Sequence, residues 1–270
     1  MARPFTVMGI VNVTPDSFSD GGLWLDEAEA VAHGFRLAQE GAGILDVGGE
    51  STRPGAEPVS EAQELRRVLP VIEGLAQRLP GTPLSIDTMK LAVAQAALAA
   101  GARLVNDVSA FRADPRLAGL VADAGCDCCL MHMQGEPGTM QVDPHYDDVV
   151  TQVAAFLEER AAFAVAEGVD PARILLDPGI GFGKTTAHNL ALLRGLDRIV
   201  ALGFPVLVGV SRKRFLGELA LREDPHDRVA AGVAANVLAY ERGASVFRVH
   251  DVAPTLDGLR VAAGTLTADD

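Results

Sequence analysis

Eight short apolar runs in this chain each end in a polar side chain that can take part in chemistry. The runs lie near residues 5–12, 43–48, 83–87, 103–108, 126–132, 173–177, 205–210 and 245–250. The polar residues at or just beyond their ends are Asn12, Asp46 with Glu50, Asp87, Asn106, His132, Asp177, Ser211 with Lys213, and Arg248 with His250. Such residues at one end of every strand are typical of the active face of a (β/α)8 barrel, so the pattern predicts one shared mouth for these groups.

The segments between the runs have the pattern of helices. Apolar residues recur with the helical period between positions 65 and 79, and Ser60 with Gln63 is expected to form a capping box before that helix. A glycine that can end a helix lies a few residues before six of the runs, at Gly41, Gly101, Gly125, Gly168, Gly203 and Gly243. These repeated units predict parallel strands that are covered by helices.

The order of the units favours an α/β fold, a single TIM barrel that spans residues 1–270 as one domain. The alternative is a doubly wound open sheet, which gathers its chemistry at one switch point, whereas here every unit contributes a polar residue. Long loops are predicted after the first and second strands, at 13–25 and 50–59, and a third at 133–145. Long loops in compact domains are usually functional, so the first two are expected to be catalytic loops.

The composition excludes several classes of function. The formal net charge is −13 and no basic stripe is visible, so nucleic acid is not expected as a partner. No apolar stretch is long enough to cross a bilayer and no signal-peptide pattern is visible, so we expect a cytoplasmic protein without a membrane partner. Cys126, Cys128 and Cys129 lack the paired spacing of metal ligands and are expected to be buried free thiols.

Positive charge gathers in the last two units despite the negative total. The loops after the seventh and eighth strands are the usual phosphate site of this fold, so we expect a pyrophosphate there. Asn12 ends the neighbouring first strand of a closed barrel, where its oxygen is expected to bind Mg²⁺ together with phosphate oxygens. The cationic residues are Arg212, Lys213, Arg214, Arg248 and His250.

Two carboxylates and one amide end three of the central strands, namely Asp87, Asn106 and Asp177. Buried carboxylates are costly unless they meet hydrogen-bond donors, and a carboxylate can hold a pair of N–H groups on a flat heterocycle. Together with Lys213 they predict a site for such a ring. For Asp87 the alternative of a helix cap remains open, because Thr88 and Lys90 follow it.

Three further segments bear on the site. Residues 48–56 combine glycines, hydroxyls and an arginine, which suits an oxyanion, although a structural turn uses the same residue types. Residues 177–185 are no P-loop, because Pro178 stands where that motif needs glycine, and their glycines are expected to let the backbone approach a ligand. Phe18 is expected to cover a ligand. His132 has no nearby partner, so a metal is not expected there.

Eight motifs follow the predicted strands, namely NVTPDSFSDGG, ILDVGGESTRPGA, SIDT, NDVS, HMQGEPGTMQ, DPGIGFGK, GVSRKRFLG and RVHDV. Taken together, they resemble those of the dihydropteroate synthases, a family of pterin-binding barrels, in the same order and over almost the whole chain. The resemblance implies condensation of 6-hydroxymethyl-7,8-dihydropterin pyrophosphate with p-aminobenzoate, which yields 7,8-dihydropteroate and pyrophosphate in folate biosynthesis.

The resemblance also implies roles for individual residues. Asp20 would stabilise positive charge on the pterin methylene, and Arg53 and Lys213 would complete the catalytic set. Asn12 would bind the cofactor Mg²⁺. The residues implied to bind the pterin are Asp87, Asn106, Met131, Asp177, Gly181 and Lys213. Those implied to bind pyrophosphate are Thr52, Arg53, Arg248 and His250. Those implied to bind p-aminobenzoate are Phe18, Pro54, Phe182, Ser211 and Lys213.

The resemblance leaves some points open. It implies a homodimer through the outer helices, and the lack of the family's leading hairpin implies another closure of the barrel bottom. Arg214 stands where relatives often have a smaller polar residue, so it is expected either to tune anion affinity or to be exposed. The alternatives are a pterin-dependent methyltransferase and a non-catalytic pterin-binding paralogue. Residues 211–213 and 51–55 argue against the first alternative, and the presence of Asp20, Arg53, Lys213 and His250 argues against the second.

Overall fold

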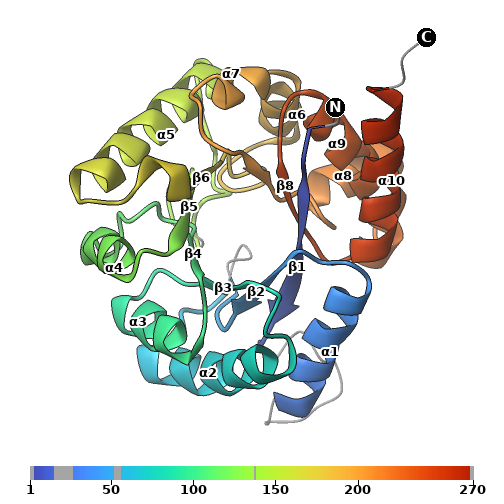
Figure 1. Cartoon of the computed structure of the whole chain (residues 1–270). Coiled ribbons are helices and arrows are strands. Elements are labelled where there is room, and N and C mark those ends of the chain that lie inside the picture. The colour runs from blue at the N-terminus through green and yellow to red at the C-terminus, as the bar shows by residue number, and fades with distance from the viewer. Residues whose placement is uncertain (1–2, 15–26, 52–55, 137, 268–270) are drawn as a thin grey trace.

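In the computed structural model, residues 3–14, 27–51, 56–136 and 138–267 are described. Within them, eight parallel strands form a central barrel and helices surround it, as the view along the barrel axis shows (Figure 1). The strands are β1 Thr6–Asn12, β2 Ile44–Gly48, β3 Leu84–Asp87, β4 Leu104–Asp107, β5 Asp127–Met131, β6 Ile174–Asp177, β7 Leu207–Val208 and β8 Val246–Val249. The α-helices are α1 Glu27–Gln39, α2 Glu61–Arg78, α3 Leu91–Ala100, α4 Arg116–Ala124, α5 Val149–Ala166, α6 Thr186–Arg194, α7 Asp197–Val200, α8 Arg214–Ala220, α9 Val229–Glu241 and α10 Val252–Thr265.

The eight predicted strands are confirmed, and the barrel is nearly closed. The sheet order is β6-β5-β4-β3-β2-β1-β8-β7, and a single parallel bridge between Leu176 and Val206 joins its two edges. Strand β7 is shorter than the predicted run 205–210, because only Leu207 and Val208 are in regular pairing. Pro205 has no backbone N–H to donate, although its carbonyl accepts the N–H of Leu176 at 3.0 Å.

Local sequence signals explain where the helices begin and end. The predicted capping box is present: the N–H of Gln63 donates to Ser60 Oγ at 3.3 Å, and the N–H of Ser60 donates to Gln63 Oε1 at 3.1 Å. The six glycines predicted to precede strands all have positive φ, between +58° and +122°. Glycine adopts this conformation without the steric cost of a Cβ atom, so each helix stops before the next strand starts.

The strands pack against apolar residues on both sides, outside the barrel and inside it. The larger cluster lies between the barrel and its helices and includes Val47, Ile86, Leu130 and Phe247. The smaller cluster fills the barrel interior with Met8, Leu104, Cys129, Leu207 and Val246. The interior cluster makes the barrel a packed core rather than a pore. Any polar chemistry is therefore confined to the ends of the strands.

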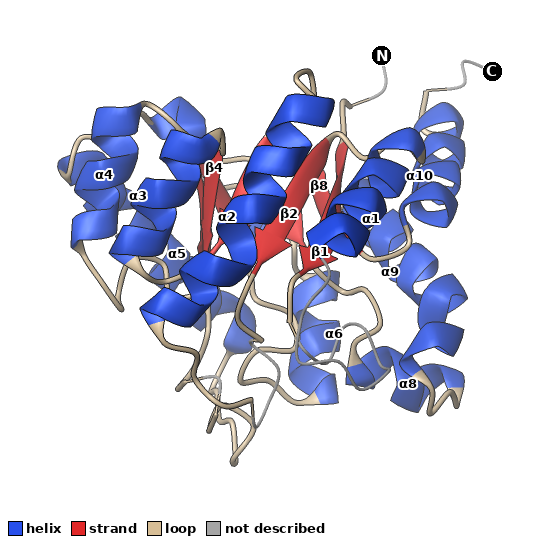
Figure 2. Cartoon of the chain, turned by 90° about the horizontal axis from the view of Figure 1, so that it is seen from below, coloured by secondary structure: helices blue, strands red, loops and turns tan. Residues whose placement is uncertain are grey.

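The loops that follow the strands gather at one end of the barrel, at the bottom of the side view (Figure 2). This end carries the polar residues that the sequence places after each strand. None of the described helices has both the length and the apolar composition needed to span a bilayer.

Candidate active site

Polar side chains form a layer at the carboxyl ends of the strands, beyond the apolar cluster that fills the barrel. Asp46, Asp87, Asn106, Asp177 and Arg248 come from five different strands. Asp46 is fully buried, and Asn106 and Asp177 are only 4% and 6% exposed. Parallel strands bring their carboxyl ends to the same face, so residues far apart in the sequence meet here.

Arg248 lies at the centre of this layer between two carboxylates. Its Nε donates to Asp46 Oδ2 at 2.6 Å and its Nη2 donates to Asp87 Oδ2 at 2.7 Å. Asn106 Nδ2 donates to the same oxygen of Asp46 at 3.1 Å. The second oxygen of Asp46 is buried and has no hydrogen-bond partner among the described residues. Two carboxylates thus share one guanidinium, which leaves the cluster with an excess of negative charge.

This environment shifts the proton affinities of the groups. Burial raises the pKa of Asp87 to about 7; the guanidinium of Arg248 opposes the rise and the carboxylate of Asp46 adds to it. Burial disfavours the charge of Arg248, but Asp46 and Asp87 outweigh that effect and raise its pKa. No role for Asp46 was predicted from the sequence, although a charged residue inside an apolar strand run was a signal that it needed a partner. Pyrophosphate binding by Arg248 remains a prediction.

Asp177 and Lys213 lie together on the other side of the layer. The N–H of Gly179 donates to Asp177 Oδ1 at 2.7 Å. Burial raises the pKa of Asp177, while Lys213 and this N–H oppose the rise. Lys213 Nζ donates to the carbonyl of Ile180 and lies 4.5 Å from the ring centroid of Phe182. Burial lowers the pKa of Lys213 to about 8, with Asp177 opposing the fall.

An apolar wall with several methionines lies beside Lys213. Gly181 faces Lys213 with φ +85°, and a Cβ atom on Gly181 would lie 2.9 Å from Lys213 Cδ, so a side chain there would displace the lysine. The thioether side chains of the wall can adapt to an irregular ligand surface. The wall consists of buried Val108, Met131, Met133 and Met140, with the partly buried Met89 and Phe182 packed against them.

Two glycines of the loop after β6 have a packing role that the sequence did not predict. We expected the glycines of this loop to let the backbone approach a ligand, which stays a prediction, and Gly179 and Gly183 also bring the backbone against the neighbouring loop. A Cβ atom would lie 1.8 Å from the carbonyl oxygen of His132 at Gly179, and 2.6 Å from that of Gln134 at Gly183. Both glycines also have positive φ. A side chain at either position would therefore strain the backbone as well as clash with the neighbouring loop.

Ser211 and His250 connect the loops after β7 and β8. Ser211 Oγ lies 3.0 Å from His250 Nδ1 and accepts the N–H of His250 at 3.2 Å. Asn12, the predicted Mg²⁺ ligand, ends β1 and is half-buried, and β1 pairs directly with β8. Asn12 thus ends one strand and His250 directly follows the neighbouring strand, as the sequence predicted for a closed barrel.

The remaining cations of this region are engaged elsewhere. Arg212 forms a bidentate ion pair with Asp251, with Nε–Oδ2 at 3.1 Å and Nη2–Oδ1 at 2.7 Å. Arg214 is exposed and pairs with Glu218 one helical turn along α8, at 2.9 Å. Of the two alternatives for Arg214, the structure therefore favours the exposed one. The predicted anion-binding residues that remain on this side are Lys213, Arg248 and His250, of which Arg248 is itself paired with Asp46 and Asp87.

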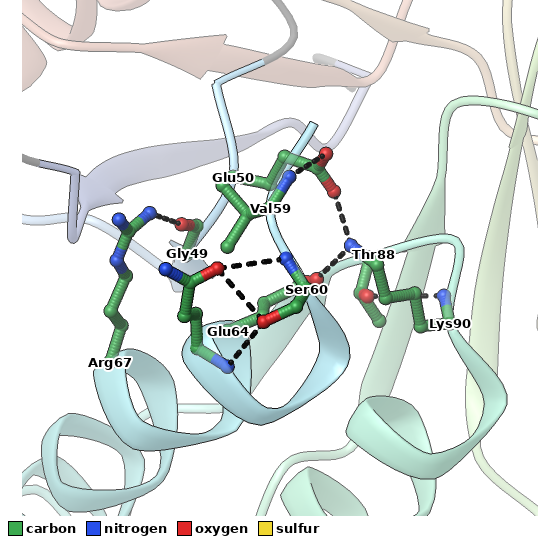
Figure 3. Close-up of polar contacts among 9 residues, drawn as sticks. Gly49, Glu50, Val59, Ser60, Glu64, Arg67, Thr88 and Lys90 are labelled. Atoms are coloured by element: carbon green, nitrogen blue, oxygen red, sulfur yellow. Dashed lines mark hydrogen bonds and ion pairs between the residues drawn. The ribbon is translucent and has the colours of Figure 1, made fainter. Parts of the chain in front are cut away.

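Ion pairs anchor the two ends of the loop that follows β2 (Figure 3). Glu50 Oε1 accepts the N–H of Val59 at 3.0 Å, and its Oε2 lies 2.5 Å from Lys90 Nζ. Lys90 Nζ also lies 2.5 Å from Glu64 Oε2, and Glu64 is fully buried. Burial opposes the charge of Lys90, but the hydrogen bonds to the two glutamates outweigh it and raise its pKa. Arg67 adds a hydrogen bond to the Gly49 carbonyl at 2.7 Å.

We expect the Lys90→Met variant to lose about 3–5 kcal/mol of unfolding free energy, because it leaves the buried Glu64 without its cation. The control is Arg116→Met, which breaks an exposed pair with Asp114 and should change the stability far less. Urea unfolding of the two variants measures both values. Equal losses in the two variants would show that the Lys90 pair contributes no more than a surface ion pair.

Several predicted site residues lie outside the described part of the chain. They are Phe18, Asp20, Thr52, Arg53 and Pro54.

The described residues include no group of three or more His, Cys, Asp or Glu side chains placed to hold a metal ion. His132 contacts Lys184 Nζ through Nδ1 at 2.9 Å. The three cysteines are buried free thiols, as predicted, and burial raises their pKa values.

Comparison with known proteins agrees with this geometry. Residues 8–250 match the family model of the pterin binding enzymes. A dihydropteroate synthase of Neisseria meningitidis serogroup B is 48% identical over 94% of this chain and 90% of its own length. The structure of Xanthomonas albilineans dihydropteroate synthase with 4-aminobenzoic acid superposes with a TM-score of 0.92 at 55% identity, covering 99% of this chain and 94% of that chain.

A second structure of the Xanthomonas albilineans enzyme, in complex with 7,8-dihydropteroate, superposes with a TM-score of 0.89 at 51% identity. It covers 98% of this chain and 95% of that chain. The similarity therefore extends over the whole barrel.

Proposed function

The chain belongs to the family of pterin binding enzymes, and we propose that it is a transferase that condenses 6-hydroxymethyl-7,8-dihydropterin pyrophosphate with p-aminobenzoate. The products are 7,8-dihydropteroate and pyrophosphate, in a step of folate biosynthesis. One observation carries the proposal: Asp87 and Asn106 end neighbouring strands, Asp177 lies beside Lys213 at the same end of the barrel, and the loops of Ser211 and His250 are adjacent. A flat ring with alternating N–H groups and acceptors suits the first set, and an anion suits the second.

In this proposal the pterin lies across the polar layer. The carboxylate of Asp177 accepts N–H groups of the ring, and Asp87 and Asn106 provide further polar contacts from β3 and β4. Met131 and Gly181 line the same space, because Met131 belongs to the apolar wall and Gly181 leaves room for Lys213. A buried carboxylate has lost its hydration, so N–H groups of a bound ring would offset the cost of burying its charge. This favours binding of the pterin at Asp177.

The pyrophosphate lies toward β8 and β1. His250 would bind it from β8, with Arg248 from the centre of the layer and Thr52 and Arg53 from the loop after β2. Asn12 fits one position of a Mg²⁺ shell, because a neutral amide oxygen suits a hard cation that takes its other ligands from water and phosphate. When bound there, Mg²⁺ would neutralise charge that develops on the leaving pyrophosphate.

The chemical step exchanges one bond at the pterin methylene carbon. The carbon–oxygen bond to pyrophosphate breaks, the carbon–nitrogen bond to the amine forms, and the amine loses one proton to the released pyrophosphate or to solvent. Positive charge on the methylene carbon would be stabilised by Asp20. p-Aminobenzoate would lie between Phe182, Ser211 and the stem of Lys213, with Phe18 and Pro54 from the other loops. The neutral amine is a weak nucleophile, so its orientation by these groups matters more than a strong base.

Turnover with purified protein tests the proposal against its two alternatives. We expect pyrophosphate release that requires the pterin pyrophosphate, p-aminobenzoate and Mg²⁺ together. A non-catalytic paralogue would bind the pterin without release. A methyltransferase would transfer a methyl group to a corrinoid and leave the pyrophosphate ester intact.

The pKa values predict a narrow pH optimum for kcat/KM with the pterin pyrophosphate. Asp87 accepts hydrogen bonds through both of its oxygens only when it is ionised, so activity should fall as pH drops below its pKa of about 7. Lys213 must be protonated to donate, so activity should fall as pH rises above its pKa of about 8. The pH profile of kcat/KM measures both limbs. Asp87→Asn should remove the acidic limb and Lys213→Arg the alkaline one; unchanged limbs would assign them to other groups.

Two further features belong to the proposal. A homodimer is supported by exposed apolar residues on the outer helices: Val261, Leu266 and Leu238 are 70%, 53% and 47% exposed, next to a groove between α9 and α10. Sedimentation equilibrium tests this, and Val261→Lys should shift the protein toward monomer.

A cytoplasmic location is supported by the three free thiols, which are typical of reducing compartments.

A further inference from the structure

Four consecutive carbonyl groups in the loop after β6 each accept a hydrogen bond from a different side chain. The loop carries Phe182, which lies beside Lys213. The backbone of a surface loop is usually solvated. Here four side-chain donors in a row take the place of water and hold the backbone in one conformation. The pairs are Ile180 with Lys213, Gly181 with Gln141 (2.7 Å), Phe182 with Lys184 (2.9 Å), and Gly183 with Tyr146 (2.9 Å).

Lys184 is the unusual donor among them, because it is only 3% exposed. Its ammonium contacts His132 Nδ1 at 2.9 Å, the Phe182 carbonyl at 2.9 Å and the His132 carbonyl at 3.4 Å. These three neutral acceptors match its three N–H bonds. Among the described residues no carboxylate forms an ion pair with Lys184, and burial lowers its pKa well below the ordinary value, with Asp177 opposing the fall.

His132 is built to accept from this lysine. A contact from an ammonium to Nδ1 requires that this nitrogen carry no proton. Burial and the nearby charge of Lys184 lower the pKa of His132 to about 3, so the ring is neutral at physiological pH. Its orientation is fixed by an edge-on contact with Phe156, with the ring centroids 4.8 Å apart.

The cost of burying Lys184 calls for a reason other than stability. A buried charge is expensive, and an apolar side chain of similar length would often serve a fold equally well. The close approach of Gly179 and Gly183 to the loop after β5 already joins the two loops. What Lys184 adds is a link between His132 and the carbonyl of Phe182, the residue whose ring lies beside Lys213.

We propose that Lys184 is a positioning residue, which fixes Phe182 through its backbone and thereby sets the place of the Phe182 ring beneath the Lys213 ammonium. The inference rests on the proposed function, in which Phe182 and Lys213 border p-aminobenzoate. Lys184 itself touches neither substrate in this arrangement. Its effect should therefore appear in the binding of p-aminobenzoate more than in that of the pterin.

The test compares steady-state kinetics of the unsubstituted protein and of Lys184→Met. We expect KM for p-aminobenzoate to rise about tenfold, the effect of about one lost hydrogen bond to a charged group, while KM for the pterin pyrophosphate rises much less. If Lys184→Met folds and its KM for p-aminobenzoate equals that of the unsubstituted protein, the positioning role is overturned. A rise of KM by the same factor for both substrates would also overturn it.

A matched pair at His132 provides the rescue experiment. His132→Asn can place an amide oxygen where Nδ1 accepts from Lys184, whereas His132→Leu removes the acceptor. We expect KM for p-aminobenzoate in His132→Asn to stay near the unsubstituted value, and His132→Leu to follow Lys184→Met. If Lys184→Met does not fold, this pair decides the question, and identical behaviour of the two variants would overturn the proposal.

A crystal structure separates this inference from the proposed function. If the unsubstituted protein forms no dihydropteroate, the proposed function fails, but the position of the Phe182 ring can still be compared between it and Lys184→Met. A displaced ring with an intact barrel supports the positioning role. A ring that stays 4.5 Å from the Lys213 ammonium would contradict it.

Discussion

The Lys213→Ala variant should lose at least about tenfold to a hundredfold in kcat/KM, because one charge-assisted hydrogen bond contributes roughly 1.5–3 kcal/mol. Lys213 is partly buried between Asp177, the Ile180 carbonyl and the Phe182 ring, where pterin and p-aminobenzoate would meet. Its loss removes a contact to both substrates. Steady-state kinetics with each substrate varied in turn measures the effect.

Arg214→Ala is the matched control for this variant. It removes a positive charge from the adjacent residue, but Arg214 is exposed and pairs only with Glu218 along α8 among the described contacts. We expect its kcat/KM to remain within about twofold of the unsubstituted value, as for most surface substitutions. Equal losses in the two variants would contradict the assignment of Lys213 to the substrates.

The Arg248→Met variant should lose about 3–5 kcal/mol of unfolding free energy near pH 8, because it leaves Asp46 and Asp87 facing each other without a cation. Without Arg248 the pKa of Asp87 in the folded state should rise further above its ordinary value. The folded state then binds more protons than the unfolded state, so stability should recover as pH falls through that raised pKa.

Urea unfolding of Arg248→Met at pH 8 and pH 6 measures this effect. Arg173→Met breaks a half-exposed pair with Asp127 and serves as the control, with an expected loss below about 1 kcal/mol at both pH values. A loss for Arg248→Met that does not shrink at the lower pH would contradict the shared role of Asp46 and Asp87.

The barrel could be predicted from the sequence because its signals are local. Each apolar run, each helix-ending glycine and the capping box at Ser60 lie within one unit, and the structure confirms them. The length of β7 could not be predicted in this way. It depends on the pairing of Leu176 with Val206, which closes the barrel between strands that the sequence alone does not align.

From the sequence, the site could be predicted only as a set of residues that lie at the same end of the barrel. The partners within the set depend on contacts across the barrel, such as the pairing of Arg248 with Asp46, which are 202 positions apart in the sequence. For the same reason no role for Asp46 could be predicted from the sequence. The contacts of Gly179 and Gly183 with the loop after β5 could not be predicted either, because they join two loops that are far apart in the sequence.

The most direct test of the account is whether the protein joins the two substrates. We expect that incubation of the protein with 6-hydroxymethyl-7,8-dihydropterin pyrophosphate, Mg²⁺ and p-aminobenzoate labelled with ¹⁵N at the amine yields dihydropteroate. Mass spectrometry should find the label in that product, in amounts equal to the pyrophosphate released. Release of pyrophosphate with only hydroxymethyl dihydropterin as product, or pterin binding without any conversion, would contradict the proposed function.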